Sequence, residues 1–162
     1  MPARSRSAVE PESEREHWIT RVLEVPARIV FEAYGKPEHL LRWFGPKGYP
    51  LALCEMDFRV GGRYRFAMND PSGKLMTPFS GEYLEIVKNQ KISYSNTMEH
   101  AGAETMIVTL TFEERDGKTT LTLHTLFGSV AMKQKHLELG YEVGSGIALD
   151  QLSELTLELL GR

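Results

Sequence analysis

Residues 137–160 read "LELGYEVGSGIALDQLSELTLELL" and form the longest stretch of helical periodicity in the chain. Apolar and small side chains recur there at spacings of three and four, which places them along one face of a helix. This stripe comprises Leu137, Tyr141, Ser145, Ala148, Leu152, Leu155 and Leu159. The helical pattern begins after Phe127 and continues to Leu160. We therefore expect one long C-terminal helix whose apolar face packs on another layer.

The first half of this stretch is rich in glycine, with Gly140, Gly144 and Gly146 within seven residues. A glycine inside a helix costs about 1 kcal/mol relative to alanine, so three of them need an explanation. They either let the helix lie close against its neighbouring layer, or leave unfilled volume between the two. The sequence is compatible with both.

Upstream of the helix, apolar and polar residues alternate in strand-length runs. We expect strands at 17–25, 51–57, 63–69, 77–87, 91–98, 104–114 and 119–127, and short helices at 26–35 and 36–44. Turn-forming residues separate the later runs, and Asp116-Gly117 is the strongest hairpin signal among them. In the run at 77–87 the apolar residues change parity, which indicates a β-bulge. Successive strands joined by short turns predict an antiparallel meander covered on one face by the long helix, an α+β fold.

Composition limits the size and setting of the protein. A chain of 162 residues, 41% of them apolar, corresponds to about one domain. Residues 1–16, "MPARSRSAVEPESERE", are too polar to bury a core, so we expect a mobile tail followed by a single domain at 17–162.

Charge, cysteine content and hydropathy narrow the expected partners. The net charge of −3 disfavours binding to nucleic acid. The single cysteine, Cys54, cannot form an internal disulfide, and no stretch resembles a secretion signal or a membrane span. We expect a cytoplasmic monomer or homodimer without membrane insertion.

Signatures of catalysis are absent from the sequence. It contains no G-x-S-x-G elbow, no H-E-x-x-H motif and no phosphate-binding loop, and its five histidines lack the spacing of metal ligands. We therefore expect no metal or cofactor, and the sequence does not favour an enzyme.

Large side chains on one face of the predicted sheet oppose the small side chains of the helix. If unfilled volume lies between them, it forms an apolar pocket. The predicted ligand-binding residues are Trp43, Phe44, Tyr64, Phe66, Met68, Tyr83, Tyr94, Leu110, Phe112, Leu123, Tyr141, Gly144 and Ala148. Trp43 and Phe44 lie about 100° apart on a helix, so we expect one to anchor the core and the other to line the entrance. The alternative is that both fill the core.

Several of these segments resemble the activator of heat shock protein 90 ATPase homologue-like group of the SRPBCC (START-like) superfamily. They are "VPARIVFEAYGKPEHLLRWFGPKGY", "DFRVGGRYRFAM", "SGEYLEIV", "VTLTFEERDGKTTLTL" and the helical stretch quoted first. The resemblance covers residue 18 to the C-terminus. It implies the helix-grip fold, also called START-like or Bet v-like: a curved seven-stranded antiparallel sheet around a C-terminal helix, with two short helices after the first strand and a deep apolar cavity. In such a fold the second short helix and the loop after it lie at the mouth of the cavity, so we expect the cavity to open near Trp43.

The resemblance and the residue pattern together leave three functional classes. The first is binding of a small hydrophobic ligand, lipid-like, aromatic or polyketide-like, within the cavity. The second is a cyclase or aromatase that uses the same cavity and needs a general acid or base there. The third is a module that interacts with a chaperone and activates its ATPase. The eukaryotic activators carry an additional N-terminal domain where this chain has a short polar tail, so we expect a chaperone partner least.

Overall fold

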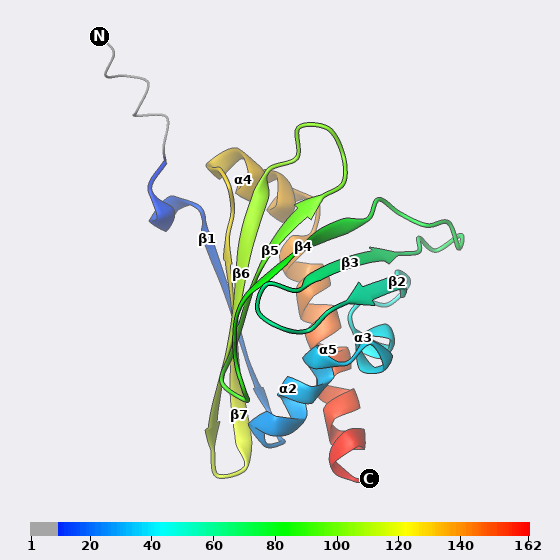
Figure 1. Ribbon diagram of the computed structural model, residues 1–162, viewed down its shortest axis with the longest axis vertical. Helices are drawn as coiled ribbons and strands as arrows, with labels where there is room; N and C mark the ends of the chain where they lie inside the picture. Colours follow the sequence, from blue (N-terminus) through cyan, green and yellow to red (C-terminus); the bar gives the residue numbers. More distant parts are fainter. Residues whose placement is uncertain (1–9) are drawn as a thin grey trace.

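The computed structural model describes residues 10–162 and contains every predicted strand and both short helices (Figure 1). The elements are η1 (Glu12–Glu14), β1 (Glu16–Leu23), α2 (Ala27–Gly35), α3 (Pro37–Trp43), β2 (Leu51–Met56), β3 (Arg63–Met68), β4 (Phe79–Val87), β5 (Lys91–Met98), β6 (Thr105–Arg115), β7 (Lys118–Leu126), α4 (Val130–Glu138) and α5 (Tyr141–Leu160).

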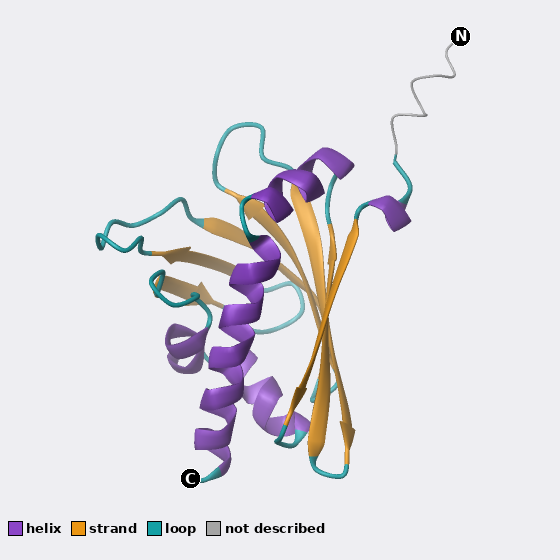
Figure 2. Cartoon of the chain, turned by 180° about the vertical axis from the view of Figure 1, so that it is seen from behind, coloured by secondary structure: helices purple, strands orange, loops and turns teal. Residues whose placement is uncertain are grey.

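The seven strands form one antiparallel sheet in the order β1-β7-β6-β5-β4-β3-β2. Strands β2 to β7 follow one another as the predicted meander, while α2 and α3 carry the chain from β1 at one edge to β2 at the other. The sheet curves around α5, with α2 and α3 on the same side (Figure 2). Helix α5 contacts α2, α3 and β1. This is the helix-grip fold.

Two local backbone features follow the sequence signals. Asp116 and Gly117 both have positive φ, 53° and 77°, as the tight turn between β6 and β7 requires. The pairing of β4 with β5 shifts register between Tyr83 and Glu85, which confirms the predicted bulge.

The C-terminal helix is not continuous, contrary to the prediction. Helix α4 ends at Glu138, and Gly140 with φ of 92° stands between it and α5. Only glycine adopts this left-handed conformation without steric cost, so Gly140 ends one helix and does not lie inside another. Leu137, predicted to lie in the core stripe, is 37% exposed because it belongs to α4. The buried residues of α5 are Ala148, Leu149, Leu152, Leu155, Thr156 and Leu159.

The predicted tail at 1–16 extends too far along the chain. Residues 1–9 lie outside the described part, but Glu12–Glu14 form a 3-10 turn and β1 begins at Glu16. The Arg15 guanidinium donates a 2.7 Å hydrogen bond to the Phe127 carbonyl, and the backbone N–H of Val130 donates to Glu10. These partners are more than a hundred residues away, so local composition does not reveal them.

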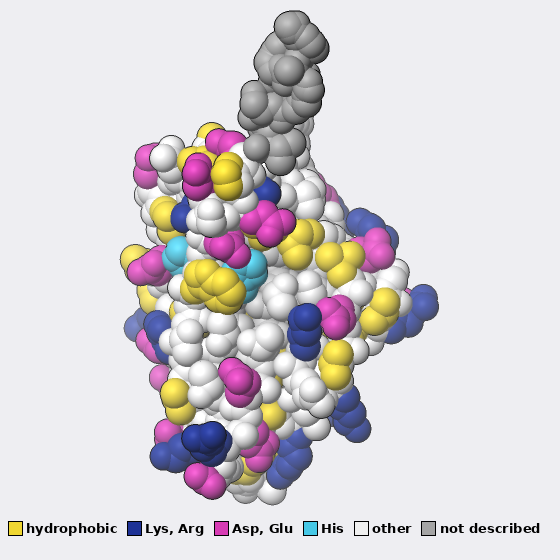
Figure 3. Space-filling view, turned by 90° about the vertical axis from the view of Figure 1, so that its left-hand side faces the viewer, with side chains coloured by type: hydrophobic (Ala, Val, Ile, Leu, Met, Phe, Trp, Pro, Cys, Tyr) yellow, Lys and Arg dark blue, Asp and Glu magenta, His cyan; other side chains and the backbone are white. Residues whose placement is uncertain are grey.

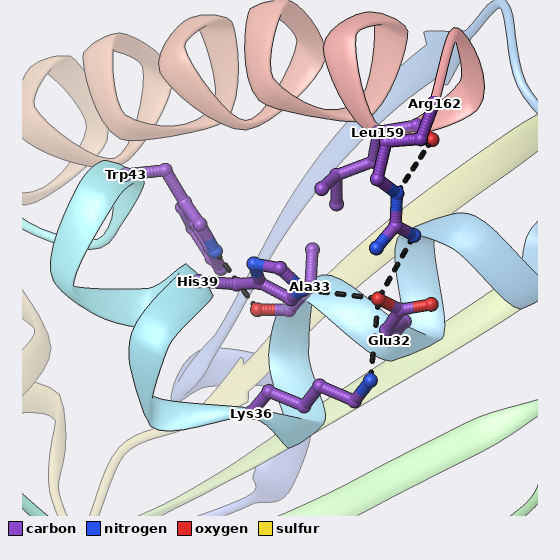
Figure 4. A network of polar contacts seen from close by, with 7 residues as sticks. All are labelled: Glu32, Ala33, Lys36, His39, Trp43, Leu159 and Arg162. Carbon is purple, nitrogen blue, oxygen red and sulfur yellow. Dashed lines mark hydrogen bonds and ion pairs between the residues drawn. The ribbon is translucent and has the colours of Figure 1, made fainter.

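Trp43 joins α3 to α2 within the core (Figure 4). The side chain is 3% exposed, and its Nε1–H donates a 3.0 Å hydrogen bond to the Ala33 carbonyl. In a continuing helix that carbonyl would accept from residue 37, but Pro37 has no N–H. The indole therefore satisfies a carbonyl that the proline leaves without a donor. Of the aromatic pair, Trp43 is the core anchor.

A charged cluster lies beside this anchor (Figure 4). The Glu32 carboxylate of α2 lies 3.0 Å from His39 Nε2 of α3, 3.4 Å from Lys36 Nζ and 3.0 Å from Arg162 Nη2. The hydrogen bond from His39, and further ones from Arg162 and Lys36, lower the pKa of Glu32 to about 2. The cluster ties α2 and α3 to the end of α5.

Replacing the anchor tests the carbonyl argument. Trp43→Phe is expected to lower the free energy of unfolding by at least about 1–3 kcal/mol, the cost of leaving a buried carbonyl unpaired. Chemical denaturation measures the loss. Trp18→Phe is the control, because Trp18 is 60% exposed on the outer side of the sheet, where histidine and apolar side chains lie among charged ones (Figure 3). Its expected change is below about 0.5 kcal/mol. Equal losses in the two variants would contradict the role given to Ala33.

The charged cluster predicts a pH dependence. Because the folded-state pKa of Glu32 lies below its ordinary value of 4.5, its ionisation stabilises the fold above that pH, and the contribution is lost as the pH falls toward 2. Glu32→Gln is expected to destabilise the protein at neutral pH by on the order of 1–3 kcal/mol, with the difference from the parent shrinking between pH 4.5 and 2. Denaturation at a series of pH values measures this. Glu24→Gln, which removes the exposed pair with Lys118, should leave the profile unchanged. A constant difference across the acid range would show that Glu32 acts through packing alone.

Candidate ligand-binding site

A cavity of about 330 Å³ lies between the concave side of the sheet and the N-terminal half of α5. The sheet contributes Tyr64, Phe66, Met68, Phe79, Tyr94, Asn96, Met98, Met106, Val108 and Leu123. The helices and their loops contribute Tyr34, Trp43, Phe44, Pro46, His136, Leu139, Gly140, Tyr141, Gly144, Ser145, Ala148 and Leu149. Most of the lining is aromatic, aliphatic or sulfur-containing, so the cavity is predominantly apolar.

The two interior glycines of α5 have different roles. A Cβ atom at Gly144 would meet only the Pro46 Cγ at 3.9 Å, so this glycine faces open space. A Cβ atom at Gly146 would lie 3.0 Å from Arg21 Nη2, the end of a flexible and partly exposed side chain. The cavity interpretation therefore holds at Gly144, and at Gly146 no backbone or core side chain requires a glycine.

Most of the predicted site residues line the cavity. They are Trp43, Phe44, Tyr64, Phe66, Met68, Tyr94, Leu123, Tyr141, Gly144 and Ala148. Trp43 is both anchor and wall, while Phe44 is partly exposed beside it. Gln151 of α5 donates hydrogen bonds to the carbonyls of Trp43 and Gly45, at 2.9 Å and 2.7 Å, which hold this wall against the helix.

Three predicted residues lie elsewhere. Leu110 and Phe112 are buried in the solid core, where Phe112 packs edge-on against Phe31 and Tyr34. Helix α2 fills the concave face at that end of the sheet, which the alternation of β6 does not reveal. Tyr83 borders a separate space of about 20 Å³ together with Tyr34, Tyr64 and Tyr94.

Some lining residues were missed by sequence reasoning. Asn96 follows Tyr94 by two residues on β5, so the period of a strand places both on the same face and would have identified it. His136 and Leu139 were missed because the prediction of a continuous helix hid the corner at Gly140. Leu139 is 77% exposed and lines the cavity, so the cavity opens beside this corner.

The polar groups of the lining are few. The Tyr64 hydroxyl lies 2.7 Å from both the Ser95 carbonyl and Asn96 Oδ1, and the Tyr141 hydroxyl lies 2.6 Å from Thr125 Oγ1. His136 Nδ1–H donates a 2.9 Å hydrogen bond to the Met132 carbonyl. No Asp, Glu, Lys or Arg side chain is among the residues that line the cavity in the described part of the chain. The site therefore offers neutral hydrogen-bonding groups and no fixed charge.

Burial decides the protonation of these tyrosines. Desolvation raises the pKa of Tyr34, Tyr64 and Tyr94 well above the ordinary value for a phenol. Each is therefore a neutral hydroxyl near pH 7 and serves as a hydrogen-bond donor, not as a base. Desolvation likewise raises the pKa of Cys54 to about 11, so its thiol is not a ready nucleophile.

Residues 10–162 contain no cluster of three or more His, Cys, Asp or Glu side chains that could hold a metal ion. The helices in this range are too short or too polar to cross a lipid bilayer.

The chain resembles several proteins of known structure. A protein from Chromobacterium violaceum is 28% identical, with a TM-score of 0.76 over 88% of this chain and 96% of that one. A protein from Nitrosomonas europaea is 25% identical, with a TM-score of 0.82 over 94% of this chain and all of the other. A Staphylococcus epidermidis protein is 28% identical, with a TM-score of 0.74 over 93% of both chains. A search of curated proteins finds no match.

A family model provides the assignment. The model described as "Activator of Hsp90 ATPase homolog 1-like protein" matches residues 24–156, which include the sheet from β2 to β7, all four α-helices up to Thr156 and the whole cavity lining. With this match and the helix-grip fold established, the chain belongs to the activator of Hsp90 ATPase homolog 1-like family of the SRPBCC superfamily.

Proposed function

We propose that the protein binds a small, predominantly apolar ligand in the cavity between the sheet and α5. The observation that carries this proposal is open space opposite Gly144, walled by aromatic and methionine side chains. A volume of about 330 Å³ falls at the lower end of the range for ligand pockets, about 300–1,000 Å³. Lipid-like, aromatic and polyketide-like molecules are the ligand types that an apolar lining of this kind suits.

The cavity lowers the stability of the fold, and this loss supports the proposal that the cavity serves a function. Protein interiors are packed about as densely as organic crystals, and unfilled volume in a core destabilises the fold. A glycine at position 144 adds a helix-propensity cost of about 1 kcal/mol relative to alanine. A side chain at this position would remove both costs, since nothing but Pro46 lies within reach of its Cβ. The open space is thus a feature that stability alone does not favour.

The enzymatic alternative finds less support in the lining. A cyclase or aromatase needs a general acid or base, and the tyrosines are held neutral by burial. His136 is the one imidazole among the lining residues that the structure describes, and its Nδ1 is engaged by Met132. Activation of a chaperone ATPase, which the family description names, would depend on a docking surface and not on Gly144.

Filling the cavity tests the proposal. Gly144→Leu is expected to abolish binding of the neutral fluorescent dye Nile red, because the new side chain occupies the open space. The melting temperature should stay the same or rise, since the helix loses an interior glycine. Fluorescence titration and thermal melting measure the two effects.

The matched control is Val143→Leu, which enlarges the exposed neighbouring side chain on the outer side of α5. Dye binding should persist in this variant. If the parent protein does not bind Nile red, or if Gly144→Leu unfolds the protein while Val143→Leu does not, the cavity is not a binding site and the position requires close packing.

A further inference from the structure

The cavity contains hydrogen-bond donors without partners. Among the described residues, nothing accepts from the hydroxyls of Tyr34 and Tyr94, although both side chains line the cavity. The Asn96 oxygen lies 2.7 Å from the Tyr64 hydroxyl, whose one proton is shared with the Ser95 carbonyl, and the Asn96 NH₂ group has no acceptor within residues 10–162. Buried polar groups in proteins are normally paired, so unpaired donors on the cavity lining, from β5 and from α2, are informative.

These donors are open to the cavity. Within the described chain, His17 Nδ1 is the one side-chain nitrogen or oxygen that is both fully buried and unpaired. The free atoms of Tyr34, Tyr94 and Asn96 are therefore accessible. All three side chains line the cavity, and Tyr34 and Tyr94 also border the smaller space of about 20 Å³. A small molecule in the cavity can reach them.

Tyr64 lies next to two of these groups. Its hydroxyl is 2.7 Å from Asn96 Oδ1, and its ring centroid is 5.5 Å from that of Tyr94. Tyr34 lines the same cavity from α2. The donors thus belong to one polar region within an apolar cavity.

The rings around this site are in contact with one another. Phe44 packs edge-on to Phe66 at 5.5 Å between ring centroids, and Tyr64 edge-on to Tyr94 at 5.5 Å. A ligand ring in the cavity can pair with these side chains in the same edge-to-face geometry. Methionine side chains, which adapt to varied shapes, complete the lining at Met68, Met98 and Met106.

We infer that the ligand is a neutral aromatic ketone or a related carbonyl compound, whose oxygen accepts hydrogen bonds from Tyr94, Asn96 and Tyr34. This inference rests on the proposed function and deepens it. A carbonyl oxygen is an acceptor without a proton, so it matches a set of donors. A fatty-acid carboxylate does not match, because no Lys or Arg lines the described cavity to balance its charge and burying an unpaired charge is costly. The site therefore selects against fatty-acid anions.

Three naphthalenes of nearly equal shape test the inference at neutral pH: acetylnaphthalene, ethylnaphthalene and naphthoate, substituted at the same ring position. Acetylnaphthalene, which carries the carbonyl, should bind about tenfold more tightly than ethylnaphthalene, which lacks an acceptor. Naphthoate should bind most weakly. NMR titration of protein with labelled methionine methyl groups follows binding at Met98 and Met106, while Met56, outside the cavity lining, is the internal control.

Single hydroxyl deletions assign the donors. Tyr94→Phe should weaken acetylnaphthalene binding about five- to tenfold and leave ethylnaphthalene binding unchanged, and adding Tyr34→Phe should remove most of the remaining preference for the ketone. Because neither hydroxyl has a partner within the described protein, these variants should fold normally. Tyr83→Phe is the matched control, since Tyr83 lies outside the main cavity.

The outcomes separate the two proposals. If ethylnaphthalene binds as tightly as acetylnaphthalene, or naphthoate binds best, the inferred ligand class is wrong while apolar binding survives. An equal effect of Tyr83→Phe and Tyr94→Phe would also overturn the assignment. If neither neutral naphthalene shifts the methyl signals of Met98 and Met106, and Nile red does not bind, the proposed function itself fails.

Discussion

The cavity depends on burial of the C-terminal half of α5. Leu152, Leu155 and Leu159 are buried on this half, and α5 contacts α2 and α3, so the helix is held at one end by a solid apolar contact. The Glu32 cluster and the Gln151 hydrogen bonds reinforce that end. Because the helix is fixed there, its other half can span the curved sheet without collapsing onto it. The buried leucines hold one half of α5 in place, and the small residues of the other half leave the space that forms the cavity.

The short helices α2 and α3 complete that arrangement by dividing the concave face of the sheet. Tyr34 and Phe31 of α2 fill the end near Phe112, whereas Trp43 and Phe44 form a wall of the space that stays open. Pro37 sets the break between the two helices, and the indole of Trp43 satisfies the carbonyl that this break leaves without a donor. One side chain therefore closes a helix end, anchors the core and borders the cavity.

Local signals predicted the elements of the fold, and long-range contacts account for what they missed. Alternation located the strands, and the turn residues located the hairpin at Asp116-Gly117, because both depend on neighbouring residues. The corner at Gly140 was missed because a helical stripe on either side of a glycine looks continuous until its φ is known. Of the site, the sequence predicted the residues of β3 and α5, where strand and helix periodicity define a face. It wrongly added Leu110 and Phe112, since no local pattern shows that α2 covers them.

The short helices divide the concave face of the sheet into a packed end and an open end, and this division also determines the chemistry of the cavity. Where α2 meets the sheet, Phe31 and Phe112 fill the space. Where the space stays open, Tyr94 and Asn96 of β5 and Tyr34 of α2 have donors without a partner in the described part of the chain. Burial disfavours ionisation of the tyrosines, so they hold their protons and their donor character near neutral pH. The proposed binding of a carbonyl compound depends on these donors. A change at one of their positions would alter the proposed ligand preference without disturbing the leucine contact that holds the fold.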